Sequence, residues 1–503
     1  MTNSRQIRAK KNIVTSLLTQ MVVILCGIIL PRLMIGAFGS EAYGATTSIT
    51  QFLAYITLLE GGIGGVARAV LYKPLAQKDM QTISSIMEEI KRFFRVIAYI
   101  FAGYVLILAC GFQTISQITC MDWIATFVLV VVISISTFGQ YFIGISHSIL
   151  LQADQKSYIT NALSIGATVL NAICTIILIQ LNCNLIVVKL VSSIIFFMRP
   201  VILSLYVRKN YALNKAKEQG KQSYLTQKWT GLGQHIAYFL HSNTDIAILT
   251  ILADLRTVAV YSVYNMIISH LQSLAVSFSS GMEAVFGDML ARDEKEELHE
   301  TFRTYETILS VVSILLFSVT AVVIIPFIKL YTTGITDADY IQPIFALLMV
   351  LISLSYCLRL PYHSMVIAAG HFKQTSVAAY GEAAINIGLS VILVSKFGLI
   401  GVAVATLIAT WFRFIYYVFY LSKNIFNRDI KLFIKRFAIN TGAFLFNCAI
   451  GYAVTMCFHF NSYLTWVACG ALLVIIIGAS TLAINIAFFR SDCRVLIKKI
   501  IKR

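Results

Sequence analysis

The stretch from Leu464 to Phe489, LTWVACGALLVIIIGASTLAINIAFF, contains 26 residues and no charged side chain. A helix needs about 20 apolar residues to cross the hydrocarbon core of a bilayer. Backbone polar groups in lipid must be bonded within the segment, and this run lacks the alternation of polar and apolar residues that a barrel strand shows. The stretch therefore predicts a transmembrane helix.

Apolar runs of this kind recur from Asn12 to Phe489, separated by short polar connectors. The composition agrees, because 58% of the residues are hydrophobic, 13% are charged and the mean hydropathy is +0.80. The chain is predicted to be an all-α polytopic membrane protein with about fourteen transmembrane helices. The predicted spans are 12–34, 44–66, 93–115, 122–144, 157–180, 184–207, 230–252, 257–281, 305–327, 340–363, 376–396, 399–421, 437–458 and 464–489.

The distribution of basic residues predicts the orientation of these spans. With both termini in the cytoplasm, the inner connectors, the span ends beside them and the two tails hold 32 of the 40 Lys and Arg residues, while the outer connectors hold 4. This positive-inside bias favours an even number of spans. The net charge of +17 is therefore attributed to contact with anionic membrane lipids, and no nucleic acid partner is expected.

A repeat divides the chain into two halves. HSILLQADQK at 147–156 is echoed by HSMVIAAGHFK at 363–373, an offset of 216 residues, and Asn171 matches Asn386 at an offset of 215. Six spans separate equivalent positions, so the two halves have the same topology and should be related by an axis along the membrane normal. Transporters of this construction place their binding site between the two lobes, near the midplane of the membrane.

Several motifs resemble the polysaccharide-transporter branch of the multidrug/oligosaccharidyl-lipid/polysaccharide (MOP) exporter superfamily. They are GSEAYG at 39–44, LEGGIGGVAR at 59–68, LQADQK at 151–156, and Asp245 followed by Tyr261. The resemblance implies a MATE-like fold with two six-helix lobes and two further helices. The predicted parts are an N-lobe at 1–207, a basic cytoplasmic loop at 208–229, a C-lobe at 230–421, and two helices with a basic tail at 422–503.

The same resemblance implies a function. Members of this branch are flippases of the bacterial inner membrane. They move an undecaprenyl-pyrophosphate-linked oligosaccharide, such as an O-antigen or capsule unit, from the cytoplasmic to the outer leaflet. The expected partners are this lipid-linked oligosaccharide, membrane lipids and other proteins of polysaccharide assembly.

Polar side chains at helical spacing within the spans predict the residues of a cavity, because such faces are costly against lipid. A diphosphate is bound well by Arg, whose planar guanidinium bonds two oxygens at once. The predicted substrate-binding residues are Arg32, Arg199, Arg359, Arg413, Tyr238, Tyr356, Asn171 and Asn386. Each of the embedded Arg residues could instead reach the membrane surface with its long side chain or serve a structural ion pair.

Coupling to an ion gradient is expected at embedded carboxylates. Asp245 and His241 lie one turn apart on the same face of span 230–252, and Glu60 and Glu382 are the other candidates. The predicted coupling ion is H⁺ or Na⁺, although a structural ion pair explains each carboxylate about as well. No cofactor or metal is predicted: the ten cysteines show no paired spacing, and the chain has no nucleotide-binding GxxxxGK[ST] motif.

Two rival functions remain at this stage. A cation-coupled multidrug antiporter of the same superfamily would need acidic residues facing its substrate. In the predicted spans, however, four embedded cations (Lys189, Arg199, Arg359, Arg413) outnumber three embedded carboxylates. A membrane glycan polymerase or glycosyltransferase would need a long outer loop or an extramembrane domain, and the longest connectors here are short and inner. The chain is therefore predicted to be a transporter and not an enzyme.

Overall fold

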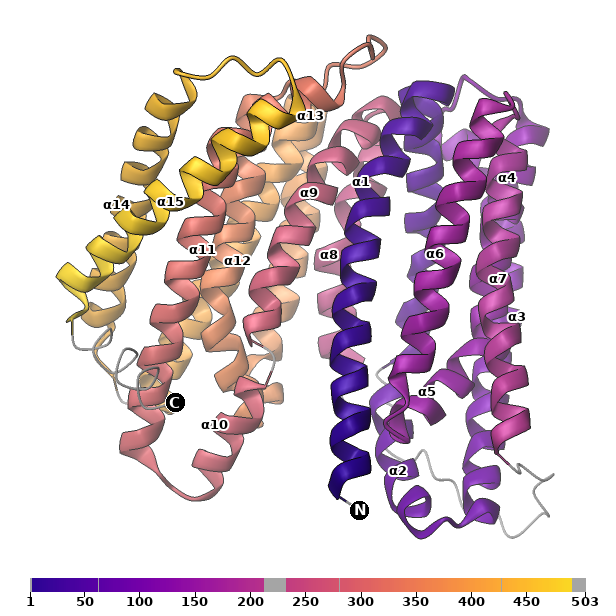
Figure 1. The fold of residues 1–503 in the computed structure, drawn as a ribbon, viewed down its shortest axis with the longest axis horizontal. Helices are drawn as coiled ribbons and strands as arrows, with labels where there is room; N and C mark the ends of the chain where they lie inside the picture. Colours follow the sequence, from indigo (N-terminus) through magenta and orange to yellow (C-terminus); the bar gives the residue numbers. More distant parts are fainter. Residues whose placement is uncertain (1, 62, 212–231, 280, 427, 491–503) are drawn as a thin grey trace. The chain divides into compact units, whose positions relative to one another are not determined.

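The structure, a computed structural model, describes residues 2–61, 63–211, 232–279, 281–426 and 428–490. Within these ranges it leaves undescribed the side chains of residues 2–5, 232–235, 237, 238, 240–242 and 278. The described chain forms helices and no strand (Figure 1). In this part of the chain, ten helical segments are long and apolar enough to cross a membrane. The prediction of an all-α polytopic membrane protein is confirmed, while the count of fourteen spans stays a prediction.

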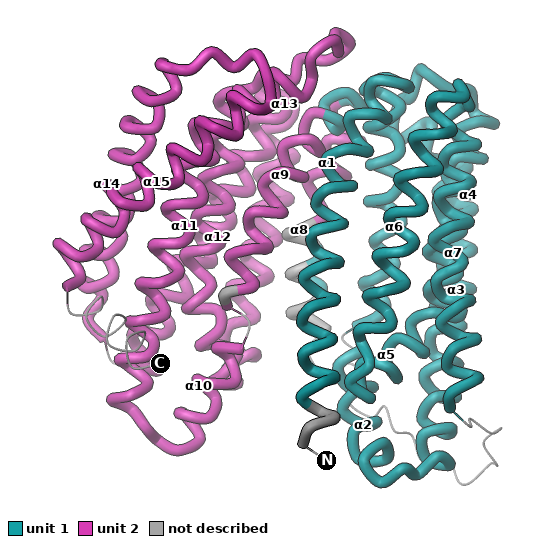
Figure 2. The backbone as a smooth tube through the Cα atoms, in the orientation of Figure 1, with its two compact units in different colours: residues 1–239, 254–259 teal, residues 240–253, 260–503 magenta. Residues whose placement is uncertain are grey.

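The chain divides into two compact units (Figure 2). Unit 1 contains Met1–Phe239 and Asp254–Ala259, and unit 2 contains Leu240–Ala253 and Val260–Arg503. The helices before the undescribed residues 212–231 all belong to unit 1: α1 (Thr2–Ala54), η1 (Tyr55–Glu60), α2 (Ile63–Gln77), α3 (Met80–Ser116), α4 (Trp123–Gly139), η2 (Gln140–Gly144), α5 (Ile145–Ala153), α6 (Ser157–Gln180) and α7 (Leu185–Asn210). The helices after those residues are α8 (Leu232–Leu252), α9 (Leu255–Ser279), α10 (Met282–Ala291), α11 (Lys295–Tyr331), α12 (Pro343–Ala368), α13 (Phe372–Asn424), α14 (Ile430–Thr455) and α15 (Tyr463–Phe488).

Two of the predicted connectors are glycine kinks within longer helical segments. In α1 the chain bends at Gly39, where φ is 83° and ψ is 165°. In α13 it bends at Gly398, where φ is 51° and ψ is −126°. Glycine adopts such positive φ angles without the steric cost that a Cβ atom imposes. Each kink lies between two predicted spans, so the chain reverses there with almost no loop.

The prediction of one continuous helix over 44–66 is wrong. The α-helix gives way to the 3₁₀ turn η1, then to Gly61 with a left-handed φ of 56°, and a new helix begins at Ile63. Gly64 and Gly65, which follow in α2, have no atom within 4 Å of where a Cβ would lie, so they do not serve close packing. The glycine-rich stretch therefore interrupts the helix.

The inner connectors 67–92 and 282–304 are mostly helical and not open loops. α2 continues to Gln77, and α3 begins at Met80 with Asp79 as its N-cap. The apolar stripe continues past the span, because Leu71 and Ile83 are fully buried. An amphipathic stripe at helical spacing keeps a segment helical beyond the membrane. α10 and the first turns of α11 extend helix through the second connector in the same way.

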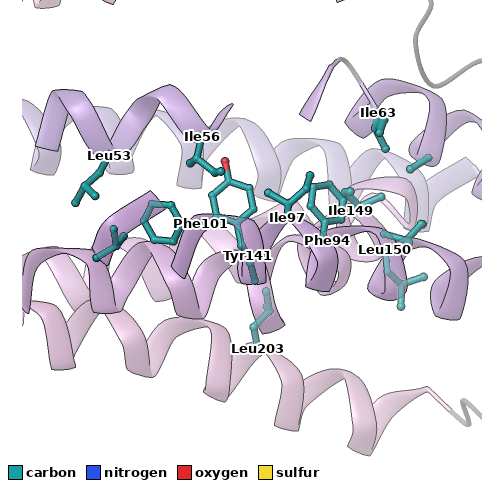
Figure 3. Close-up of a cluster of buried hydrophobic side chains, with 14 of the residues drawn as sticks. Leu53, Ile56, Ile63, Phe94, Ile97, Phe101, Tyr141, Ile149, Leu150 and Leu203 are labelled. Carbon is teal, nitrogen blue, oxygen red and sulfur yellow. The ribbon is translucent and has the colours of Figure 1, made fainter. Parts of the chain in front are cut away.

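The core of unit 1 is a cluster of aliphatic and aromatic side chains (Figure 3). Phe94 and Phe101 of α3 flank Tyr141 of η2 at ring-centroid distances of 6.4 Å and 6.2 Å. The Tyr141 hydroxyl donates a hydrogen bond to Glu60 at the end of η1. The interrupted second span is thereby attached to the centre of unit 1.

The predicted orientation can be checked by labelling single cysteines in a background in which the native cysteines have been replaced. Gln81 on α3 and Glu296 on α11 are exposed and lie in predicted cytoplasmic connectors, whereas exposed Thr336 lies in a predicted outer connector. We expect an impermeant maleimide to label Thr336→Cys in intact cells and to label Gln81→Cys and Glu296→Cys only after lysis. The reverse pattern would show that the orientation is inverted.

Candidate functional site

A buried triad of charges lies within unit 2. Glu382 accepts a bond from Arg359 of α12 at 2.6 Å between Nη1 and Oε1, and another from Arg413 at 2.6 Å between Nη1 and Oε2. The side chains of Arg359, Glu382 and Arg413 are only 6%, 0% and 4% exposed. Glu382 and Arg413 both belong to α13, and the kink at Gly398 folds the two halves of that helix back on each other. The triad carries a net charge of +1.

Aromatic side chains complete the surroundings of the triad. The Tyr417 hydroxyl accepts bonds from Arg413 at 3.0 Å from Nε and 2.8 Å from Nη2. The Arg359 guanidinium lies 5.0 Å from the centre of the Tyr356 ring, and the His363 ring stacks on Tyr417 at 5.9 Å. Such contacts stabilise guanidinium groups that have been removed from water.

A second polar cluster surrounds Asp245 of α8, also within unit 2. The Tyr261 hydroxyl donates to Asp245 Oδ2 at 3.0 Å, and Thr406 Oγ1 lies 3.0 Å from the same oxygen. Asn386 Nδ2 lies 2.8 Å from Thr406 Oγ1 and 3.4 Å from Asp245 Oδ1. These side chains come from α8, α9 and both halves of α13, and all four are buried.

This cluster has the oxygen ligands that a small hard cation prefers. Its carboxylate, hydroxyl and amide groups are the types that bind such ions in proteins. The Asn386 amide oxygen is buried and has no hydrogen-bond partner among the described residues. No group of three His, Cys, Asp or Glu residues suited to a metal ion occurs in that part of the chain. The arrangement therefore suits a proton or a monovalent cation at Asp245.

The two clusters of unit 2 are neighbours along α13. Asn386 follows Glu382 by one helical turn, and Thr410 donates to the Thr406 carbonyl at 2.8 Å, three residues before Arg413. Five of the predicted site residues are thus brought together in one unit: Asp245, Arg359, Glu382, Asn386 and Arg413. Tyr356 joins them through Arg359. The side chains of two further predicted residues, Tyr238 and His241, lie outside the described residues.

The remaining predicted site residues belong to unit 1. Arg199 donates from Nη2 to Ser164 Oγ at 2.6 Å, and Glu60 accepts the hydrogen bond from Tyr141. Arg32 lies on α1, with Nη1 3.3 Å from where a Cβ on Gly36 would be. These residues contact different neighbours and form no cluster comparable to the triad in the described part of unit 1.

The two repeat-related asparagines share one feature. Asn171 of α6 and Asn386 of α13 are both buried, and each has an amide oxygen without a hydrogen-bond partner among the described residues. The two repeat-related arginines differ. Arg413 pairs with Glu382, whereas the offset of 215 residues that relates the asparagines places Ala167 in unit 1 opposite Glu382.

Sequence reasoning missed a third buried charge cluster, around Glu306 of α11. Tyr362 donates to Glu306 Oε1, while Arg428 Nη1 and Arg436 Nε lie 3.3 Å and 3.4 Å from Oε2. Arg428 and Arg436 had been assigned to an inner connector, and Glu306 to the end of a span. A polar stripe at helical spacing on α14, Arg436 followed by Asn440, was the signal that could have placed them in the core.

The comparisons with known proteins agree on the fold. The chain matches the solved lipid II flippase MurJ, in an inward closed conformation, with a TM-score of 0.66 at 14% identity. That match covers 95% of this chain and 99% of MurJ. The fold is that of the MurJ and MATE transporters. The chain is thus a multi-pass membrane protein with a transporter fold.

Two MATE transporters illustrate the wider similarity. A multidrug resistance MATE family transporter of the MOP superfamily, in an inward-facing conformation, matches with a TM-score of 0.55 at 13% identity, covering 81% of this chain and 98% of that one. The Vibrio cholerae MATE transporter VcmN, in its bent form, matches with a TM-score of 0.52 at 16% identity, covering 84% and 99%.

The sequence comparisons are more limited. Residues 232–392 match the MatE family model. No curated protein sequence is significantly similar to this chain. The family match and the folds together support the MOP exporter superfamily.

Proposed function

We propose that this chain is a flippase of the bacterial inner membrane that moves an undecaprenyl-pyrophosphate-linked oligosaccharide to the outer leaflet. The energy would come from an H⁺ or Na⁺ gradient through alternating access. The likeness to the fold of a lipid II flippase supports a lipid-linked substrate. The remaining support comes from the charges in unit 2.

The observation that carries the proposal is the Arg359–Glu382–Arg413 triad. It has one more cation than anion in a buried environment, and Tyr417 and Tyr356 contact its two guanidiniums. A diphosphate can replace Glu382 as the partner of either Arg, because guanidinium binds phosphate and carboxylate with the same bidentate geometry. Substrate would then exchange one internal ion pair for another and leave no buried charge unpaired.

Coupling is assigned to the Asp245 cluster. Asn386 and Glu382 are one turn apart on α13, so cation binding at Asp245 and a change of partner at Glu382 act on the same helix. Moving one charge through the membrane potential supplies about 2.3 kcal/mol per 100 mV. Asp245 is chosen ahead of Glu60 and Glu382 because its carboxylate is bonded by neutral groups only among its printed neighbours, Tyr261, Thr406 and Asn386.

The second candidate function is a cation-coupled multidrug antiporter. One observation favours it: a buried carboxylate such as Asp245, without a basic partner among those neighbours, is also suited to a cationic drug. The folds of the MATE transporters are compatible with this function as well.

Depletion of the protein in its own cells separates the two functions. If the chain is a flippase, we expect a lipid-linked oligosaccharide to accumulate in the cytoplasmic leaflet of the inner membrane, because its export stops while its synthesis continues. The glycan is identified by mass spectrometry of extracted lipids, and its leaflet by its protection from an impermeant glycosidase in spheroplasts.

Complementation with the intact gene should remove the accumulated lipid. Ethidium efflux is measured in the same cells as the control for the rival function. If depletion slows ethidium efflux and leaves the lipid-linked glycans unchanged, the chain is an antiporter and the proposed function is wrong.

A further inference from the structure

We propose that unit 1 has a binding pocket for the phosphate headgroup of an anionic membrane lipid, formed by Lys91, Arg95 and Arg208. The pocket lies within unit 1 and uses none of the residues assigned above to substrate or coupling. It does not depend on the proposed transport function.

The pocket is a cavity of about 280 Å³ between three segments. Its walls are α3 and α7, each of which packs against the π-helical turn η2, and α5 continues from that turn. This volume is at the lower end for small-ligand sites, which suits a headgroup and not a whole lipid. The lining residues of α7, Val201, Ser204, Leu205 and Arg208, recur at helical spacing and so form one face of that helix.

The charge of the pocket is positive. Lys91 and Arg95 lie one turn apart on α3, and Arg208 faces them from the last turn of α7. Among the described residues, none of these three cations forms an ion pair with a carboxylate. Glu88, one turn before Lys91, is the nearest acidic influence on Lys91, and it does not line the cavity. Three cations with one nearby carboxylate leave an excess positive charge, which an anion would offset.

The floor of the pocket is held rigidly. η2 is a single π-helical turn, a feature that occurs often at functional sites. A Cβ on Gly144 would lie 3.0 Å from Pro200 Cβ of α7, so glycine permits this close approach. Buried Ser146 and His147 both bond the Ile143 carbonyl, at 3.3 Å from Oγ and 2.6 Å from Nδ1. Polar side chains are therefore fixed at the base of the cavity.

The surroundings favour a lipid over free phosphate. Leu205, which lines the cavity, is 59% exposed, and Val96 and Tyr99 on the next turn of α3 are 53% and 64% exposed. The Phe142 ring lies 5.9 Å from the Arg95 guanidinium and 6.1 Å from the Tyr99 ring. In a membrane protein, an exposed apolar surface faces acyl chains, and cations beside it bind anionic headgroups. The cations of the pocket thus lie next to a surface for the lipid tails.

The proposal is tested on the purified full-length protein by native mass spectrometry with short-chain phosphatidylglycerol. We expect the Arg95→Gln/Arg208→Gln variant to bind this lipid roughly thirty-fold more weakly than the wild type, since each cation near a membrane surface contributes about 1 kcal/mol. The matched control is Arg92→Gln/Lys209→Gln. It removes two exposed cations from the same helices, and neither lines the cavity. The control should bind as the wild type does.

Three outcomes would overturn the proposal. The control may lose as much affinity as the pocket variant, which would show a general surface effect. Phosphatidylcholine of the same chain length may bind as well as phosphatidylglycerol, which would show that charge is irrelevant. Millimolar inorganic phosphate may displace the lipid completely, which would show a site for free phosphate. Should the Gln variant not fold, Arg95→Lys/Arg208→Lys gives the readout: it keeps both charges and should retain phosphatidylglycerol binding, whereas loss of that binding by the folded Lys variant would refute the pocket.

Discussion

Replacement of Glu382 by Gln should destabilise the protein by about 3–5 kcal/mol. This carboxylate neutralises two buried guanidiniums, those of Arg359 and Arg413, at 2.6 Å each. Gln has the same shape but no charge, so two like charges would remain buried side by side without an anion. Breaking a buried ion pair by removing one partner costs an amount of this order. The measurement is thermal or denaturant unfolding of the purified protein in detergent.

The matched control is Glu297→Gln on α11, whose side chain is exposed. It makes the same chemical change at the surface and should alter stability by less than about 0.5 kcal/mol. The double variant Glu382→Gln/Arg359→Gln should recover part of the loss, because it removes one of the two unpaired cations. If Glu382→Gln unfolds as the wild type does, the triad does not carry its charges as described.

The fold could be predicted from the sequence because lipid imposes a simple rule. Apolar runs of about 20 residues must be helices, so the all-α class followed from composition and run length. The breaks were harder to predict. The end of the helix at Ala54 and the left-handed Gly61 depend on local backbone geometry, and the run 44–66 contains the same residue types on either side of the break. Helix in the inner connectors came from burial of residues such as Leu71, which hydropathy alone does not reveal.

The candidate site was predicted in its parts but not in its pairing. Embedded charges are costly in lipid, so Arg359, Glu382 and Arg413 were expected to face protein. That one carboxylate would bridge both Arg residues depends on the bend at Gly398, and residue spacing does not give this bend. Glu306 was missed because its partners are 122 and 130 residues away in the sequence. Hydropathy placed them all near a membrane surface.

Replacement of Asp245 by Asn should abolish gradient-driven transport while retaining substrate binding. Asn keeps the shape and the hydrogen bonds to Tyr261 and Thr406, which lie 3.0 Å from Oδ2, but it loses the negative charge that binds a cation. Without that charge the imposed gradient no longer acts on unit 2. In proteoliposomes, we expect flux under an imposed Na⁺ or pH gradient to fall to the leak of protein-free liposomes. Exposed Asp288→Asn on α10 is the control and should transport normally.

The same assay distinguishes the two ions. If Na⁺ is bound, the Asn386 amide oxygen, buried without a partner among the described residues, is a ligand, and Asn386→Leu should remove the response to a Na⁺ gradient. If H⁺ is bound, only Asp245 is needed, because Asn386 does not take up a proton, and Asn386→Leu should keep most of the response to a pH gradient. Normal transport by Asp245→Asn under both gradients would show that Asp245 is structural. Coupling would then have to be assigned to Glu60, which Tyr141 bonds in unit 1, or to Glu382 in the triad.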